Sequence, residues 1–378
     1  MAWSLRLLTV RGIPIRVHIS FLLVLLWAGY LGLVGDAARG WHGMAFMVAF
    51  VVLLFACIAL HELGHGLVAQ LFGVEVRDIT LWPIGGVARL GTMPEKPHEE
   101  FLISAAGPAT NLLVAIVLGF AALAWLGLGP FIELATTPRL LGRVVFARDG
   151  HALLLLLVLN NVILALFNLI PAFPMDGGRL LRSILAAVMP FRTATRVATS
   201  VGQVLAILMG IFGILSTDWV LLLVSLLVFA AAWQERQQVQ LKVNLRGLRV
   251  RQAMQPLSVR LHPVQTLGSA LAQAATTSQS VFVVEEGGRM MGVVTRGDLL
   301  RGVRKAGASA RVADRMRRNP WRLGPEELLS ELANRFDDDP SAVAVIIDDG
   351  QLSGTLGKGD LQRLAELLSV CPEALPRG

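Results

Sequence analysis

The sequence predicts an α-helical polytopic membrane protein of about six transmembrane helices, followed by a soluble α/β module. The first observation is composition: 54% of the 378 residues are hydrophobic and only 16% are charged, whereas a soluble domain is about a quarter charged. The second is distribution, because residues 1–234 hold 25 charged residues and the shorter stretch 235–378 holds 36. The third is a repeated strand and helix pattern near the C-terminus. The first part of the chain is therefore predicted to lie in a bilayer and the second part in water.

Apolar segments long enough to cross a bilayer recur through the first part of the chain. A transmembrane helix needs about 20 predominantly apolar residues. The last two segments meet at Thr217 and Asp218, which predicts a tight hairpin. The predicted spans are 18–35, 43–72, 101–128, 151–170, 198–216 and 218–233.

The distribution of Lys and Arg predicts the orientation of these spans. Basic residues precede the first span and lie on the same side after the second, fourth and sixth, so both termini are predicted to be cytoplasmic in a cell membrane. Three arginines between the third and fourth spans oppose this bias: Arg139, Arg143 and Arg148. We expect no cleavable signal peptide. No basic cluster is interleaved with aromatic residues, which argues against a nucleic acid partner.

Two similar units of about 60 residues follow the last span. Each contains a short apolar strand, a Gly-rich turn, and a second strand that ends in Gly-Asp before a helix. Such a repeat predicts two small α/β modules packed together. The predicted domains are a membrane domain at 1–234, a linker at 235–248, and two modules at 249–308 and 309–370.

A metal site is predicted inside the second span. His61 and His65 are four residues apart in the sequence His-Glu-Leu-Gly-His, so a helix places both on one face. Neutral imidazole suits Zn²⁺, and a bound zinc lowers the pKa of its water to about 7. Glu62 lies beside His61 and can take a proton from that water. The competing interpretation is a chance motif, but ionisable residues in a transmembrane segment usually mark function.

A catalytic zinc keeps a water and needs a third protein ligand. Asp176 supplies a carboxylate on a Pro- and Gly-bounded break after the fourth span. Irregular backbone at membrane depth must be buried in protein or line a cavity, which favours Asp176 as the third ligand. The alternative interpretation is a plain helix-ending turn with a solvated aspartate. The predicted topology places His61, His65, Asp176 and the start of the third span at one depth.

These motifs resemble those of the site-2 protease family of intramembrane metalloproteases. His61–His65 matches the family's HExxH motif, and Asn168 to Gly177 matches its N-x-x-P-x-x-P-x-D-G motif. The resemblance covers about residues 5–234 and implies that His61, His65 and Asp176 are zinc ligands and Glu62 the general base. It implies a protease that cuts membrane-protein substrates in regulated intramembrane proteolysis.

Two further elements carry less specific expectations. Gly107-Pro108-x-x-Asn111 resembles a third family element, so Asn111 and Asn168 are candidates to hold the substrate carbonyl or stabilise the oxyanion. Both asparagines could equally serve helix packing. Alternating residues around Gly85 and Gly86 predict a hairpin whose edge pairs with substrate, or one that merely anchors at the membrane surface.

The C-terminal pair resembles cystathionine-β-synthase (CBS) domains. In such domains a Gly-x-x-Thr/Ser-x-x-Asp stretch commonly meets ribose and phosphate. Thr295 and Asp298 match this pattern in the first unit, whereas Gly357 replaces the Thr in the second and Asp360 remains. The resemblance implies one site for ATP or AMP and a homodimer through these domains. The alternative is that both units only pack and dimerise.

Two other function classes compete with the protease. A membrane transporter with a CBS regulatory tail would also carry charges in its spans, but it does not explain the HExxH motif combined with a distant Asp motif. A catalytically silent scaffold is the second, and it does not explain why all candidate ligands and the base are present. The sequence identifies neither the substrate nor the direction of nucleotide regulation.

Overall fold

The computed structural model describes residues 3–34, 40–83, 85–91, 96–129, 149–339 and 341–371. The chain divides into two compact units, Met1–Arg236 and Gln237–Gly378. The three arginines that oppose the predicted orientation lie between 130 and 148, outside the described residues.

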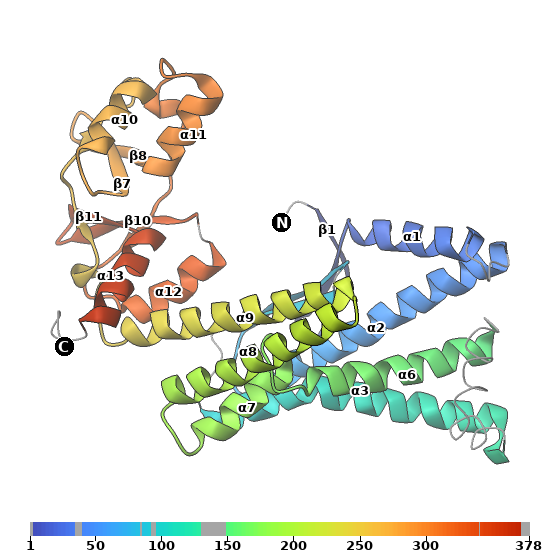
Figure 1. Cartoon of the computed structure of the whole chain (residues 1–378). Helices are drawn as coiled ribbons and strands as arrows, with labels where there is room; N and C mark the ends of the chain where they lie inside the picture. The colour runs from blue at the N-terminus through green and yellow to red at the C-terminus, as the bar shows by residue number, and fades with distance from the viewer. Residues whose placement is uncertain are drawn as a thin grey trace. The chain divides into compact units, whose positions relative to one another are not determined.

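The first unit is mainly helical. Figure 1 shows α2, α3 and α6 running side by side. Five described helices, α2, α3, α6, α8 and α9, are long and apolar enough to cross a membrane, so the chain is a multi-pass membrane protein. The helices are α1 (Phe21–Val34), α2 (Trp41–Leu71), α3 (Pro97–Leu126), α6 (Gly150–Asn168), α7 (Asp176–Ala186), α8 (Phe191–Leu215) and α9 (Trp219–Asn244).

The first and last predicted spans differ from the observed helices. The segment predicted at 18–35 appears as α1, which has only 14 residues and is about 21 Å long at 1.5 Å per residue. It starts late because a β-strand extends to His18. The last span continues beyond residue 233 as α9, so the predicted linker is helical as far as Asn244.

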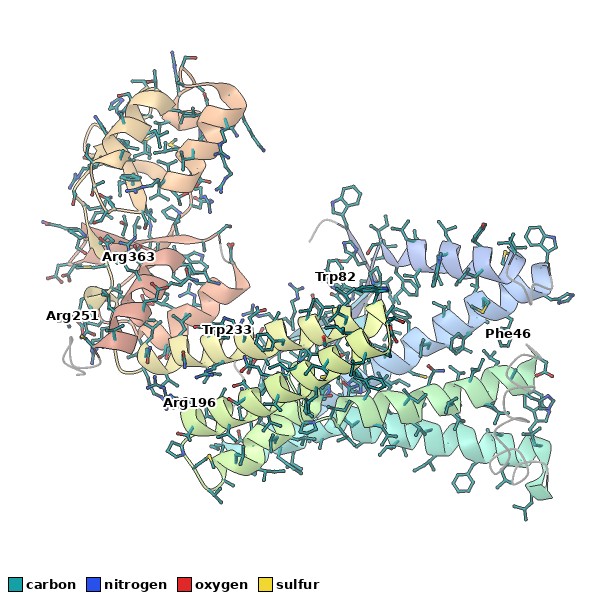
Figure 2. All side chains as sticks on the ribbon, viewed as in Figure 1. Phe46, Trp82, Arg196, Trp233, Arg251 and Arg363 are labelled. Carbon is teal, nitrogen blue, oxygen red and sulfur yellow. The ribbon has the colours of Figure 1, made fainter. Side chains whose placement is uncertain are left out.

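A four-stranded sheet, in the order β1-β2-β3-β4, accompanies the helices of this unit. Its N-terminal hairpin was not predicted; the turn uses Arg11 and Gly12, both with positive φ, as a two-residue hairpin requires. Strand β4 is an edge strand, and Trp82 lies at the end of β3 (Figure 2). The strands are β1 (Ser4–Val10), β2 (Ile13–His18), β3 (Val76–Trp82) and β4 (Gly85–Leu90).

The second unit contains two sheets with flanking helices, and its two halves exchange segments. The sheets have the orders β6-β7-β8 and β5-β11-β10-β9, so β5 from the first repeat pairs with β11 of the second. The elements are β5 (Gln255–Pro256), β6 (Arg260–Leu261), α10 (Leu267–Ala275), β7 (Val281–Glu286), β8 (Arg289–Thr295), α11 (Arg296–Ala306), β9 (Trp321–Leu323), α12 (Leu329–Asp338), β10 (Val343–Asp348), β11 (Gln351–Gly357) and α13 (Lys358–Val370).

The hydrophobic cores of this unit show the same exchange. Leu245, Leu248 and Val250 precede the first repeat's strands but are buried with Phe336 in the core of the second repeat. Conversely, Val312 is buried in the core of the first repeat. The two cores therefore do not follow the predicted division between residues 308 and 309.

Candidate metal centre

Two imidazoles and one carboxylate converge inside the helical unit. On α2, His61 and His65 are one helical turn apart and both are buried, with Nε2 atoms 3.1 Å from each other. The Oδ2 atom of Asp176 lies 3.3 Å from Nε2 of His61 and 3.1 Å from Nε2 of His65. One possible ligand atom from each side chain lies within 4.8 Å of the others. His65 and Asp176, which are 111 positions apart in the sequence, thus face the same point.

Asp176 reaches this point because the chain breaks between α6 and α7. It is the first residue of α7, and the turn before it packs too closely for a side chain at the next position. A Cβ on Gly177 would overlap the carbonyl oxygens of Ile170 and Leu169.

Helix α3 forms the wall behind the histidines. At Gly107 its backbone passes directly against both rings, because a Cβ there would overlap Nε2 of His65 and come within 2.7 Å of Cε1 of His61. A second close approach lies at Gly64, where a Cβ would come within 2.9 Å of the Ala106 carbonyl oxygen. Glycines at these two positions let α2 and α3 approach closely, as in many membrane helix pairs.

Hydrogen bonds orient both imidazole rings from the same helix. Nδ1 of His65 lies 2.7 Å from the Ile103 carbonyl oxygen, so Nδ1 carries the proton and Nε2 keeps its lone pair. Nδ1 of His61 lies 2.9 Å from the side-chain amide of the fully buried Asn111. A metal on Nε2 requires that the amide oxygen faces Nδ1, which a half-turn of the amide provides.

Glu62 lies beside the edge strand of the sheet. Its Oε2 accepts a hydrogen bond of 3.2 Å from the backbone amide of Ala88 in β4. A Cβ on Gly86 would come within 2.8 Å of Cγ of Glu62, so the missing side chain leaves room for the glutamate. Glu62 is not among the three converging ligands and is therefore free to act on a proton.

This donor set fits zinc. Catalytic zinc sites have three protein ligands drawn from His, Asp, Glu and Cys, with the fourth position left for water or substrate. Two imidazole nitrogens with a carboxylate oxygen meet that description, and the carbonyl and amide behind the rings supply the hydrogen bonds that fix ligand orientation in metal sites.

The remaining predicted residues of this unit lie in different surroundings. The side chain of Asn111 contacts His61, and its predicted contact with the substrate stays a prediction. Nδ2 of Asn168 donates to the Leu164 carbonyl of its own helix at 2.9 Å. Gly85 and Gly86 begin the edge strand β4, and Gly86 lies against Glu62.

Sequence reasoning missed the backbone groups of the site. The Ile103 carbonyl and the Ala88 amide carry no side-chain signal, because any residue supplies them. A buried ion pair between Glu100 and Arg182 was also missed. Both residues are visible as charges in the sequence, but 82 positions separate them and no local pattern pairs them.

In the second unit, Thr295 and Asp298 form the N-terminal cap of α11. Oδ2 of Asp298 accepts from the Thr295 hydroxyl at 2.8 Å, and the Asp298 amide donates to that hydroxyl at 3.0 Å. Burial opposes ionisation, but hydrogen bonds from Thr295, Arg301 and Arg317 outweigh it and lower the pKa of Asp298. Asp298 is therefore an anion that arginines surround.

Asp360 occupies the equivalent position in the second repeat but is more enclosed. It is 2% exposed, and Oδ2 accepts from the Gly357 amide at 2.8 Å and the Ser280 hydroxyl at 2.9 Å. Burial outweighs these bonds and raises the pKa of Asp360. The two positions thus differ in the direction of the pKa shift and in exposure.

Comparisons with known proteins match both units. Residues 49–209 match the family model of peptidase family M50, and residues 250–305 match that of the CBS domain. The chain is 31% identical to a zinc metalloprotease of Methanocaldococcus jannaschii over 99% of both chains. It is 28% identical to a putative zinc metalloprotease of Synechocystis, over 95% of this chain and 94% of the relative.

A solved structure of a site-2 protease from Methanocaldococcus jannaschii is also similar. It is 37% identical and covers 62% of this chain and 95% of its own, with a TM-score of 0.43. A solved CBS-domain protein from Agrobacterium tumefaciens covers 31% of this chain and 98% of its own, at 19% identity and a TM-score of 0.28.

Proposed function

Since this chain belongs to peptidase family M50, the site-2 protease type of zinc metalloprotease, and carries a CBS domain, we propose that it hydrolyses peptide bonds of membrane-protein substrates in regulated intramembrane proteolysis. The observation that carries this proposal is the convergence of His61, His65 and Asp176 beside a glutamate that is not one of the three. The site lies between helices long enough to cross a membrane.

Each residue has a separate part in the proposed reaction. His61, His65 and Asp176 would hold zinc, which supplies Lewis acidity toward the scissile carbonyl and an acidified water. Glu62 takes the proton of the attacking water and then delivers it to the leaving nitrogen. The Ile103 carbonyl and Asn111 keep the imidazoles oriented through this exchange.

Strand β4 supports a way to present the substrate. A helical peptide bond is shielded by its own hydrogen bonds, so the substrate must unwind before attack. Because β4 is the edge of its sheet and its Ala88 amide contacts Glu62, an extended segment pairing with β4 at Gly85 and Gly86 would lie beside the general base.

The two competing functions receive no support from a specific observation. A transporter would not need a carboxylate and two imidazoles within 4.8 Å of one another, and a silent scaffold would not need to keep Glu62 next to them. We retain the cytoplasmic placement of both termini and a homodimer through the second unit as proposals.

Removal of the metal tests the proposed function. The purified full-length chain in detergent should contain about one zinc per chain and should cleave a model transmembrane substrate. A chelator should abolish cleavage, and added Zn²⁺ should restore it, with metal content followed by atomic absorption. A metal-free preparation that cleaves at the full rate would contradict the proposal.

Nucleotide binding to the second unit is a separate prediction. We propose one ATP or AMP site at Thr295 and Asp298, because the equivalent Asp360 is enclosed by Ser280 and the Gly357 amide. Titration calorimetry on the full-length chain should give about one site, and Thr295→Ala should weaken binding at least tenfold, or about 1.4 kcal/mol.

The matched control for this titration is Thr266→Ala. Thr266 is likewise the N-cap of its helix, α10, and its hydroxyl accepts from the Ser269 amide. Both substitutions therefore cost a helix cap, typically about 1 kcal/mol, but only Thr295→Ala should affect the nucleotide. No heat with either nucleotide, or equal weakening by both variants, would leave a unit that only packs and dimerises.

A further inference from the structure

Arg182 is a buried cation that the proposed reaction does not use. It lies on α7 with only 4% of its surface exposed. Its Nε donates to Oε1 of Glu100 at 2.8 Å, its Nη2 also donates to that oxygen, and its Nη1 donates to Oε1 of Glu235 at 2.5 Å. The guanidinium lies 5.1 Å from the ring centre of Phe173 and 5.0 Å from that of Phe191.

Such an arrangement is not explained by stability alone. Taking Arg182 and Glu100 out of water is costly, and well-packed apolar residues often stabilise a protein as much as a buried ion pair or more. What a guanidinium provides and an apolar side chain does not is fixed geometry, since its planar fork binds carboxylates in set directions and stacks on aromatic rings. The surroundings of Arg182 use both properties.

The partners of Arg182 link α7, which supplies Asp176, to α3, the helix that packs against the two histidines of α2. Its own helix, α7, begins with Asp176, and Phe173 lies three residues before that aspartate. Glu100 lies in the first turn of α3, the helix whose Ile103 carbonyl and Gly107 backbone contact His65. The distance of 3.1 Å between Asp176 and His65 therefore depends on how α7 docks on α3.

We propose that Arg182 is a positioning residue that fastens α7 to α3 and α9 and so keeps Asp176 within coordination distance of His61 and His65. This inference rests on the proposed function, because it assigns a purpose to zinc ligation by Asp176. Arg182 is not one of the three converging ligands, so it acts through the placement of the helix and not on the substrate.

The test measures zinc affinity of the full-length chain by competition with a chromophoric chelator. Arg182→Met should raise the zinc dissociation constant by tenfold or more, about the loss seen when groups behind metal ligands are removed. Arg182→Lys, which keeps the charge but not the fork, should fall between Arg182→Met and the parent. The matched control is Arg196→Met, an exposed arginine on α8 (Figure 2), which should leave the constant unchanged.

A merely structural role predicts a different result. Without Arg182, the carboxylates of Glu100 and Glu235 lose their partner. The unfolding temperature of the zinc-free protein should therefore fall whatever the role of the arginine. Adding Glu100→Gln and Glu235→Gln to Arg182→Met removes those charges and should recover the unfolding temperature but not the zinc affinity. This triple variant also carries the test if Arg182→Met alone does not fold.

Two outcomes separate this inference from the proposed function. If the parent chain binds zinc and the folded Arg182→Met or triple variant binds it within twofold as tightly, Arg182 does not position the ligand and the inference fails. If the parent chain itself binds no zinc, the proposed function fails first. Weakened zinc binding in both variants, with Arg196→Met unchanged, supports the inference.

Discussion

Glu62→Gln is expected to abolish peptide-bond cleavage while leaving zinc bound. The substitution keeps the size of the side chain, and its amide oxygen can still accept from the Ala88 amide. It removes the ability to take a proton, an effect that general-base catalysis places at about 10²–10⁴-fold in rate. Cleavage rate and metal content of the same purified sample are the two measurements.

The control for this prediction is Glu75→Gln. Glu75 is exposed, just before β3, so its neutralisation should change neither cleavage nor zinc content. Full activity in Glu62→Gln would remove Glu62 from the reaction. Loss of zinc together with activity would instead make the glutamate a metal ligand, contrary to the observed convergence of the other three side chains.

Gly107→Ala is expected to weaken zinc binding and to abolish cleavage through a single added methyl group. The new Cβ would overlap Nε2 of His65, the atom that faces Asp176, and press on Cε1 of His61. Because the added methyl group is fixed to the backbone of α3, it cannot turn away, and the imidazole rings must move. We expect at least a tenfold loss of zinc affinity, measured by chelator competition, with cleavage lost in parallel.

Gly119→Ala provides the matched control for this substitution. It lies on the same helix, and a Cβ there meets nothing within 4 Å, so the alanine should be neutral or slightly stabilising, by up to about 1 kcal/mol. If Gly107→Ala kept stoichiometric zinc and full activity, the histidines would have another way to accommodate α3, and the described packing would not determine the site.

The sequence was most informative where a motif had a fixed helical spacing. His61 and His65 share a face because of the helix repeat, and the apolar segments predicted at 43–72, 101–128, 151–170 and 198–216 each overlap a long apolar helix. The family assignment from HExxH and the distant aspartate motif is confirmed by the comparisons. In each case a local pattern contains the information.

What escaped prediction depends on contacts between distant segments. The N-terminal strands form because β2 pairs with β3, about 60 residues later, and β2 extends to His18, the first residue of the predicted first span. The orienting carbonyl of Ile103 and amide of Ala88 are backbone groups without side-chain identity. Arg182 was visible as a charge, but its pairing with Glu100 and Glu235 needed three helices in place.

The exchange of segments between the two C-terminal repeats has a genetic consequence. Leu245 and Leu248 lie ahead of the first repeat yet fill the interior of the second, while Val312 returns from beyond α11 to the first. A chain that ended at residue 308 would leave Leu245 and Leu248 without the second-repeat core that buries them. Its first repeat would also lack Val312 from its core. We therefore expect genes to gain, lose or exchange the two repeats together and not one at a time.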